Sequence, residues 1–211
     1  MPENRRWVYV VAKRTFDLAA VATAVILLSP LLVVIAAIVK ISSAGPVLYR
    51  GRRTGLYGRE FVMYKFRTMH IGAERLGTTT SLRDPRVTRV GAVLRHYKLD
   101  ELPQFLNVLR GDMSIVGPRP EVAEHTNAYS LEERDILTVL PGVTDYSSVY
   151  FANLTELLGT DDAHNMFLTK YRAQKNALRL RYVRERSFVT DLKIIMLTCG
   201  ALFAKLFAQR A

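Results

Sequence analysis

Apolar residues dominate one stretch near the start of the chain, and a proline stands in its middle. No charged residue occurs from Leu18 to Val39, and roughly 20 apolar residues are enough for a helix to cross a bilayer. Pro30 removes one backbone N–H and its ring clashes with the preceding turn, which kinks or breaks a helix. The hydroxyl of Ser29 can bond a carbonyl freed at this point. The pattern predicts a helix, a break at Ser29-Pro30, and a second helix.

Basic residues flank this apolar run on both sides, which bears on its topology. They are Arg5, Arg6, Lys13 and Arg14 before it and Lys40, Arg50, Arg52 and Arg53 after it. Because Lys and Arg mark the cytoplasmic side of a membrane segment, a helix pair that enters one leaflet and returns satisfies both flanks. The residues alone leave this re-entrant form and a straight span about equally favoured. A signal peptide is disfavoured, since its apolar core has only roughly 7–15 residues.

The pattern that follows predicts a hairpin and then a helix. Two β-prone runs in "VLYRGRRTGLYGREFVMYKFRTM" flank the turn "TGLYG", as in a β-hairpin. The polar stretch 70–90 is expected to be a surface loop. Leu102, Phe105, Leu106 and Leu109 recur at helical spacing, and Gly111 is expected to end that helix. This places Asp100 at or near its N-cap.

The remaining segments predict a loop and two more helices. Ser114–Glu121 reads as a rigid loop because two prolines bracket Arg119. The stretch "LPGVTDYSSVYF" reads as a turn followed by a short apolar segment, and residues 166–182 as a basic helix. The C-terminal segment 188–210 is apolar with spaced cations, which favours an amphipathic helix at a membrane interface over an ordinary core helix.

These elements together predict a mostly helical α+β fold. Residues 1–45 are expected to form the membrane segment and its flanks, and residues 46–211 a small globular domain with a hairpin and interfacial helices. The formal net charge of +11 suits a polyanionic partner such as nucleic acid, anionic lipid or a nucleotide diphosphate. Cys199 is the single cysteine, so no internal disulfide can form.

The adjacent carboxylates Asp100 and Glu101 are the main candidates for chemistry. Unpaired N–H groups and the positive dipole end at a helix N-terminus keep a carboxylate ionised and attract phosphate. An ionised Asp is a competent nucleophile, and the neighbouring Glu can hold a divalent cation. On spacing alone, a plain capping role for Asp100 is the simpler interpretation.

The cations expected near the same end of the domain favour phosphate chemistry. They are Lys65, Arg67, Arg95 and Arg119, and phosphoryl transfer needs such groups because charge builds on the phosphate oxygens. A basic surface explains most of the arginines, but it explains Arg119 between two prolines less well. The sequence contains no P-loop, no G-x-G-x-x-G after a strand and no His/Cys metal spacing.

Several motifs together resemble one family, the bacterial monotopic phosphoglycosyl transferases, or initiating sugar transferases. The motifs are "KRTFDL" (Lys13–Leu18), Ser29-Pro30, "YKFRTM" (Tyr64–Met69), "LDELPQFLNVLRGDMSIVGPRP" (Leu99–Pro120), "PGVT" (Pro141–Thr144) and "SFVTDLKI" (Ser187–Ile194). They follow the family's order along most of the chain, and the chain is similar to the minimal form that lacks an extra spanning module.

The resemblance implies an enzyme at the cytoplasmic face of the bacterial plasma membrane, held in one leaflet by a re-entrant helix. Such enzymes move a sugar-1-phosphate from a UDP-sugar to polyprenyl (undecaprenyl) phosphate and release UMP, which initiates surface-glycan synthesis. It implies that Asp100 forms a covalent phosphosugar intermediate and that the Asp100-Glu101 dyad works with Mg²⁺. It further implies that Lys65, Arg67, Arg95 and Arg119 bind substrate phosphates, and that nucleic acid is not a partner.

This sequence departs from the family pattern around "PGVT". Many members carry a basic residue before this motif and Gly-Trp-Ala-Gln after it, whereas this chain has Leu140 and "DYSS" (Asp145–Ser148). Contacts to sugar or nucleotide from that loop are therefore not transferred. The sugar, the glycan pathway and the oligomeric state are not determined by the sequence. A membrane-anchored basic protein that binds nucleic acid or anionic lipid without catalysis is the alternative, but it does not explain an acidic pair beside a Pro-Arg-Pro loop.

Overall fold

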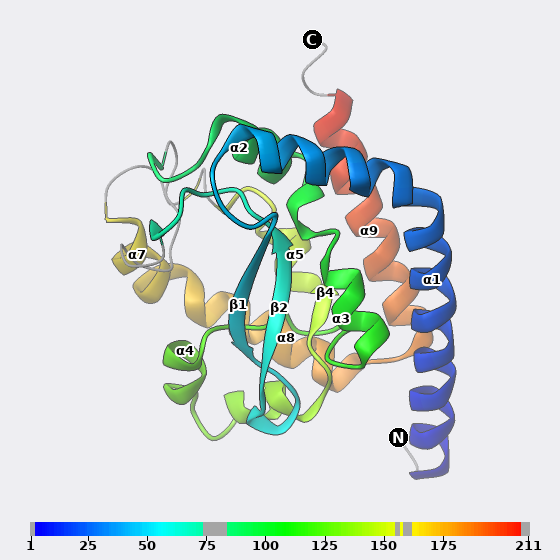
Figure 1. Ribbon diagram of the computed structural model, residues 1–211. Helices are drawn as coiled ribbons and strands as arrows, with labels where there is room; N and C mark the ends of the chain where they lie inside the picture. The colour runs from blue at the N-terminus through cyan, green and yellow to red at the C-terminus, as the bar shows by residue number, and fades with distance from the viewer. Residues whose placement is uncertain (1–2, 74–83, 155–156, 158–161, 208–211) are drawn as a thin grey trace.

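Helices surround two small sheets in the computed structural model, which describes residues 3–73, 84–154, 157 and 162–207 (Figure 1). The helices are α1 (Glu3–Ser42), α2 (Arg89–His96), α3 (Gln104–Arg110), α4 (Ala123–Asn127), α5 (Tyr146–Tyr150), α7 (Ala163–Met166), α8 (Arg172–Glu185) and α9 (Phe188–Phe207). The strands are β1 (Leu48–Thr54), β2 (Glu60–Phe66), β3 (Ser114–Val116) and β4 (Gly142–Thr144). Three short segments are 3₁₀-helical: η1 (Leu56–Gly58), η3 (Leu99–Glu101) and η4 (Glu133–Thr138). One, η5 (Phe167–Tyr171), is π-helical. The mostly helical α+β class is confirmed.

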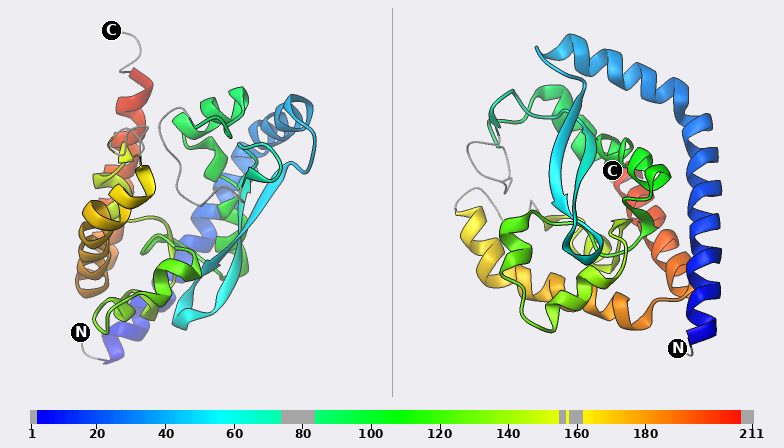
Figure 2. Two further views of the ribbon diagram at one scale, coloured as in Figure 1. Left: turned by 90° about the vertical axis from the view of Figure 1, so that its left-hand side faces the viewer. Right: turned by 60° about the horizontal axis from the view of Figure 1, so that its bottom comes forward.

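α1 is one continuous helix with a sharp bend, not two helices separated by a break. It runs up one side of the molecule and then turns across the top (Figures 1 and 2). Pro30 lies inside it, and proline is a usual cause of such a bend. The missing N–H of Pro30 leaves the carbonyl of Ile26 without its helical donor, and the Ser29 hydroxyl donates to that carbonyl at 2.8 Å. The serine thus replaces the lost bond, so the helix bends without breaking.

Both arms of α1 pack against the hairpin of β1 and β2. Val21, before the bend, joins a buried cluster with Met63 of β2. Ile35 and Val39, after the bend, join a second cluster with Phe66 of the same strand. The buried clusters on both sides of the bend therefore each include a residue of β2.

The predicted hairpin is confirmed, and a side chain of α3 secures its edge. β1 pairs antiparallel with β2 from Leu48↔Phe66 to Thr54↔Glu60. The buried Asn107 donates from Nδ2 to the carbonyl of Val62 at 2.7 Å, and its Oδ1 accepts from the N–H of Tyr64 at 3.0 Å. An amide side chain thus takes the place of a third strand along this part of β2.

α3 ends as expected but exposes part of its predicted apolar face. Gly111 terminates it in a left-handed conformation (φ 92°), which glycine adopts without strain. Leu106 and Leu109 are exposed, whereas Gln104 and Val108 lie buried. The apolar periodicity was a correct sign of a helix, but only part of the predicted apolar face is packed: Phe105 and Leu102 lie against buried clusters, whereas the two leucines of α3 are exposed.

Two segments predicted as loop or turn form a small parallel sheet. Ser114 of β3 pairs with Gly142 of β4, and Val116 pairs with Thr144. The approach is close enough that a Cβ at Gly142 would lie 2.1 Å from the backbone N of Gly117. The loop prediction for Ser114–Glu121 was wrong for its first three residues, because their partner lies far along the chain. The apolar segment after β4 begins as α5.

The basic and C-terminal helices are confirmed, and α9 starts against α1. Lys13 pairs with Asp191 at 2.8 Å, and the rings of Phe16 and Phe188 meet edge to face at 5.4 Å. From this junction the two helices diverge (Figure 2). α9 exposes Val189, Met196 and Phe203 and turns other residues inward. Within the predicted 70–90 loop, residues 74–83 lie outside the described part of the chain, as do residues 208–210 of the C-terminal segment.

Candidate active site

Glu101 is held by two cations that come from different parts of the fold. Its Oε1 accepts from Nζ of Lys65 on β2 at 2.9 Å and from Nη2 of Arg119, in the loop after β3. Burial alone would raise the pKa of Glu101, but Arg119 and Lys65 hold that pKa well below its usual range. Glu101 is therefore a carboxylate fixed in its charged form.

Asp100 has a different environment although it is the next residue. It is buried, and no hydrogen bond or ion pair of the described residues reaches its carboxylate. Burial raises its pKa, while the charge of Lys65 opposes the rise and that of Glu101 adds to it. The dyad thus combines an engaged carboxylate with one that is available to react.

The predicted helix cap at Asp100 was wrong. Asp100 and Glu101 form the tight turn η3, which follows Lys98 in the left-handed conformation (φ 58°). α3 itself begins only at Gln104, after Pro103, because a proline blocks the continuation of a helix towards its own N-terminal side. The dyad is positioned by this turn and by its cationic partners.

Arg95 and Arg67 were both predicted to bind phosphate, but the structure gives them different surroundings. Nε of Arg95 donates to Oγ1 of Thr68 at 2.8 Å, and its charge lowers the pKa of Asp100. Arg67 is buried and donates instead to backbone carbonyls at the end of α1, including that of Val39 at 3.1 Å and that of Ser43 at 2.7 Å. This geometry favours Arg95 as a member of the site and a structural role for Arg67.

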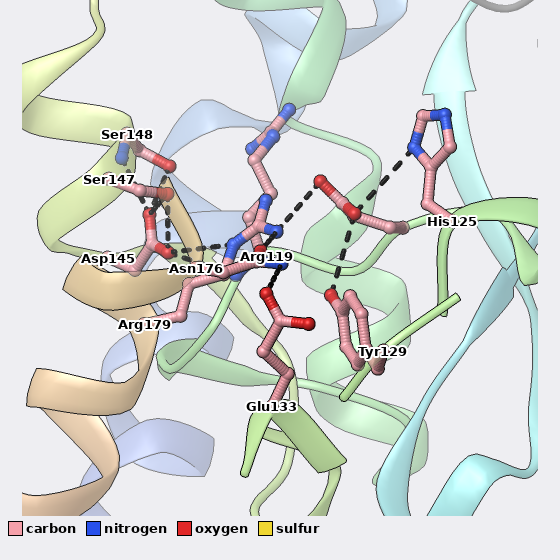
Figure 3. A network of polar contacts seen from close by, with 10 residues as sticks. Arg119, His125, Tyr129, Glu133, Asp145, Ser147, Ser148, Asn176 and Arg179 are labelled. Carbon is pink, nitrogen blue, oxygen red and sulfur yellow. Dashed lines mark hydrogen bonds and ion pairs between the residues drawn. The ribbon is translucent and has the colours of Figure 1, made fainter. Parts of the chain in front are cut away.

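A buried polar network behind the dyad was not predicted. Arg179 of α8 is 1% exposed, and its Nη1 lies 2.7 Å from Oε1 of Glu121 and bonds Asn176 at 2.9 Å. Its Nε lies 3.8 Å from Oδ2 of the fully buried Asp145. The same oxygen of Asp145 accepts from the backbone N–H of Arg119 at 3.2 Å. Figure 3 shows these side chains converging from α8, the start of α5 and the segment after β3.

This network explains the departure from the family pattern at Asp145. The side chain caps α5 by accepting from the N–H of Ser148 at 2.6 Å and also accepts from the hydroxyl of Ser147. Asp145 therefore supports the loop that carries Arg119, and its side chain is fully buried. The basic character of α8 was visible in the sequence, but the burial of Arg179 had no sequence signal.

The dyad fits a magnesium ion only if substrate supplies most of the ligands. No cluster of three or more His, Cys, Asp or Glu side chains that could hold a metal occurs among the described residues. Mg²⁺ commonly takes one or two carboxylates and fills its other positions with phosphate oxygens and water. Asp100 and Glu101 meet that requirement, and Asp100 is the carboxylate of the pair that forms no ion pair with any described residue.

Comparison with known protein families identifies the family of this chain. Residues 8–205 match the family model described as bacterial sugar transferase. The chain belongs to this family. The family motifs of the sequence now have positions in three dimensions: the Asp-Glu dyad, Lys65 and Arg119 meet at one site. Lys13 and Asp191, from the first and last motifs, join α1 to α9.

Several known proteins are similar to this chain over most of its length. A UDP-glucose:undecaprenyl-phosphate glucose-1-phosphate transferase of Xanthomonas campestris pv. campestris is 43% identical over 197 residues, which cover 90% of this chain and 38% of the relative. The protein of the same name from Escherichia coli (strain K12) is 40% identical over 191 residues, 88% of this chain and 39% of the relative. The exopolysaccharide production protein ExoY of Rhizobium meliloti (strain 1021) is 39% identical over 206 residues, 90% of this chain and 84% of the relative. The chain thus spans well under half the length of the first two relatives.

Proposed function

We propose that this protein transfers a sugar-1-phosphate from a UDP-sugar to polyprenyl phosphate and releases UMP. The observation that carries the proposal is the asymmetric dyad, in which Glu101 is fixed by Lys65 and Arg119 while Asp100 has no bonding partner among the described residues. The names of the relatives support undecaprenyl phosphate as acceptor, and most of those cited name UDP-glucose as donor. UDP-glucose is therefore the first donor to test.

The reaction proceeds in two displacements at phosphorus. A carboxylate oxygen of Asp100 attacks the β-phosphorus of the donor, the bond from that phosphorus to the bridging oxygen breaks, and UMP leaves with that oxygen. A phosphate oxygen of the acceptor then attacks the phosphorus of the aspartyl-phosphosugar. The bond to Asp100 breaks, its carboxylate is restored, and the lipid carries a diphosphate-linked sugar.

The surrounding side chains supply charge and orientation for both steps. Lys65, Arg95 and Arg119 stabilise the negative charge on the phosphate oxygens, which builds up in each transition state. Mg²⁺ bound by the dyad would neutralise part of the diphosphate charge. Glu101 holds Lys65 and Arg119 in place, and the raised pKa of Asp100 makes that carboxylate more basic than an exposed Asp.

The covalent step is tested by trapping the intermediate. The protein is incubated with UDP-[¹⁴C]glucose and Mg²⁺ without acceptor, and label on the protein and free UMP are both counted. We expect about one label and one UMP per active molecule, and neither from Asp100→Asn. Asp135→Asn, at an exposed aspartate in η4, is the matched control and should behave as the parent. Labelling of Asp100→Asn would refute the nucleophile assignment. Vesicle binding without UMP release from any UDP-sugar would favour the non-catalytic membrane-anchored protein.

We also propose that α1 enters one leaflet and returns, so that both of its ends face the cytoplasm. Among the described helices, α1 alone is long and apolar enough to cross a membrane. Its bend, the packing of both arms on β2 and the basic flanks support a re-entrant course. Single cysteines at the exposed positions Val8 and Ala44, in a Cys199→Ser background, should resist an impermeant maleimide in intact cells and react in inverted vesicles. Reaction of the Val8 position in intact cells would restore the straight span.

A further inference from the structure

A cavity of about 530 Å³ lies between the first arm of α1 and the tip of the hairpin. Its walls include Trp7 and Val10 of α1, Tyr57 in the hairpin turn, and Leu140 before β4. Its volume is in the range of small-ligand sites, which are roughly 300–1,000 Å³. The mostly aromatic and aliphatic wall favours an occupant with an apolar part.

This cavity is separate from the candidate active site. Tyr57 lies at the tip of the hairpin, whereas Lys65 lies near the other end of β2. Five residues from Glu60 to Lys65, at roughly 3.3 Å per residue, separate the two ends by roughly 17 Å. None of Lys65, Asp100, Glu101 and Arg119 lines the cavity. The cavity and the candidate active site are therefore lined by different residues.

The charges that face the cavity leave a positive excess at Arg14 and Arg186. Lys13 also lines it, but the buried Asp191 neutralises that lysine at 2.8 Å. The single lining carboxylate, Asp17, is buried and accepts from the hydroxyl of Ser114 at 2.6 Å. The remaining ionisable groups in the wall are the phenols of Tyr9, Tyr57 and Tyr182.

Neither arginine of the cavity has a carboxylate partner among the described residues. Arg14 donates to the carbonyls of Met113 and Leu109, both at 3.4 Å, which are long contacts. Arg186 donates to the carbonyl of Val183 at 2.6 Å. Carbonyl oxygens do not neutralise a guanidinium, and two guanidinium groups beside an apolar wall suit an anionic phosphate attached to a hydrocarbon chain.

We infer that this cavity binds an anionic glycerophospholipid, with the phosphate at Arg14 and Arg186 and part of an acyl chain against the apolar wall. The inference rests on the membrane attachment included in the proposed function, and not on catalysis. The lining stretch of α1, from Trp7 to Asp17, immediately precedes the uncharged run that begins at Leu18. A helix that enters the bilayer at that point carries the cavity at headgroup level, where Trp and Tyr are enriched.

The same geometry argues against two related occupants. Polyprenyl phosphate shares the chemistry of a lipid phosphate, but as acceptor it must bring its phosphate to Asp100, which does not line the cavity. Free inorganic phosphate suits the arginines but leaves the apolar wall without a contact. The experiment therefore compares these occupants directly.

Trp7 provides the measurement, because it lines the cavity and is the single tryptophan of the chain. The full chain is reconstituted in phosphatidylcholine nanodiscs, and brominated phosphatidylglycerol or brominated phosphatidylcholine is added as quencher. We expect half-maximal quenching at a lower mole fraction of the anionic lipid. A Lys or Arg near an anionic lipid contributes about 1 kcal/mol, or about fivefold in affinity. Arg14→Gln/Arg186→Gln should therefore raise the half-maximal mole fraction about 25-fold.

Three further variants make the outcome specific. Arg14→Lys/Arg186→Lys keeps the charge and should keep most of the preference, whereas a loss through misfolding would affect both double variants. Arg134→Gln/Arg184→Gln removes two exposed arginines outside the cavity and should leave the preference unchanged. Asp100→Asn should lose UMP release and retain quenching, which separates failure of this inference from failure of the proposed function.

The inference is overturned by equal quenching from the two brominated lipids. It is also overturned if the two glutamine double variants lose the preference equally. If polyprenyl phosphate reverses the quenching at a lower mole fraction than unbrominated phosphatidylglycerol does, the cavity binds the acceptor. Relief by millimolar inorganic phosphate alone would assign it to a soluble anion.

Discussion

Replacing Arg179 by methionine removes the cation at the centre of the buried network and keeps an unbranched side chain. Arg179 is 1% exposed and pairs at 2.7 Å with Glu121, which is also buried. Asp145, with no exposed surface, lies 3.8 Å away. Arg179→Met therefore leaves Glu121 charged in a low-dielectric site without its closest cation.

The expected loss of stability follows from these contacts. Removing one partner of a buried ion pair costs about 3–5 kcal/mol, and 1 kcal/mol corresponds to about 2–4 °C in Tm for a chain of this size. We expect Arg179→Met to lower Tm by about 6–20 °C. In Arg179→Met/Glu121→Gln the unpaired charge is gone, so the double variant should recover at least half of that loss.

Burial alone would raise the pKa of Glu121, but Arg179 and Lys175 hold it below its usual value. The stability from this pair is therefore present above the ordinary Glu pKa and is lost as the pH falls through the lower native value.

Thermal unfolding in nanodiscs, followed by near-UV circular dichroism between pH 3 and pH 8, measures these effects. Arg181→Met is the matched control, because Arg181 lies on the same helix and pairs with Glu185 at 2.9 Å on the exposed surface. Exposed pairs contribute little, so its Tm should hardly change. The reasoning fails if Arg179→Met and Arg181→Met lower Tm by the same amount. It fails equally if the double variant is as unstable as the sum of its single changes.

Three shorter predictions concern the site, the bend and a half-buried lysine. Arg95→Gln removes a charge that lowers the pKa of Asp100, so the acid limb of the kcat/KM profile for UMP release should move to higher pH; an unmoved limb would contradict this. Ser29→Ala leaves the carbonyl of Ile26 without its 2.8 Å donor and should cost about 1 kcal/mol, or about 2–4 °C in Tm, whereas Ser29→Thr should cost less. Burial lowers the pKa of Lys175 to about 8, and below that pH the fold holds its charge unfavourably. Lys175→Met should therefore raise Tm at pH 7, and this advantage should shrink between pH 8 and pH 10; an advantage that grows with pH would refute the sign.

Patterns that act over a few residues were read correctly from the sequence. The hairpin followed from two β-prone runs around a glycine turn, and the end of α3 followed from Gly111. Pro30 correctly marked the position of the bend in α1, but the predicted break was wrong, because the bond from Ser29 to Ile26 keeps the helix continuous. Local backbone preferences decide such features, and local sequence records them.

Features that depend on distant partners were missed. β3 pairs with β4, whose residues come 28 positions later, and neither segment is a convincing strand by itself. Arg67 and Arg119 occur in similarly basic motifs, yet Arg67 binds carbonyls at the end of α1 while Arg119 binds Glu101. Residue type does not distinguish these arginines, because their roles depend on which elements pack beside them.

The packing of α1 on β2 has a consequence for where the proposed chemistry takes place. Met63 shares a buried cluster with the arm before the bend and Phe66 shares one with the arm after it, and Lys65 lies between them in the sequence of β2. In the proposed topology, the depth of the apex of α1 in the lipid therefore sets the height of Lys65 above the membrane. The helix therefore sets the distance of the active site from the membrane as well as attaching the protein to it. Moving Pro30 by one helical turn would displace Lys65 relative to a lipid-borne phosphate without changing any residue that touches substrate.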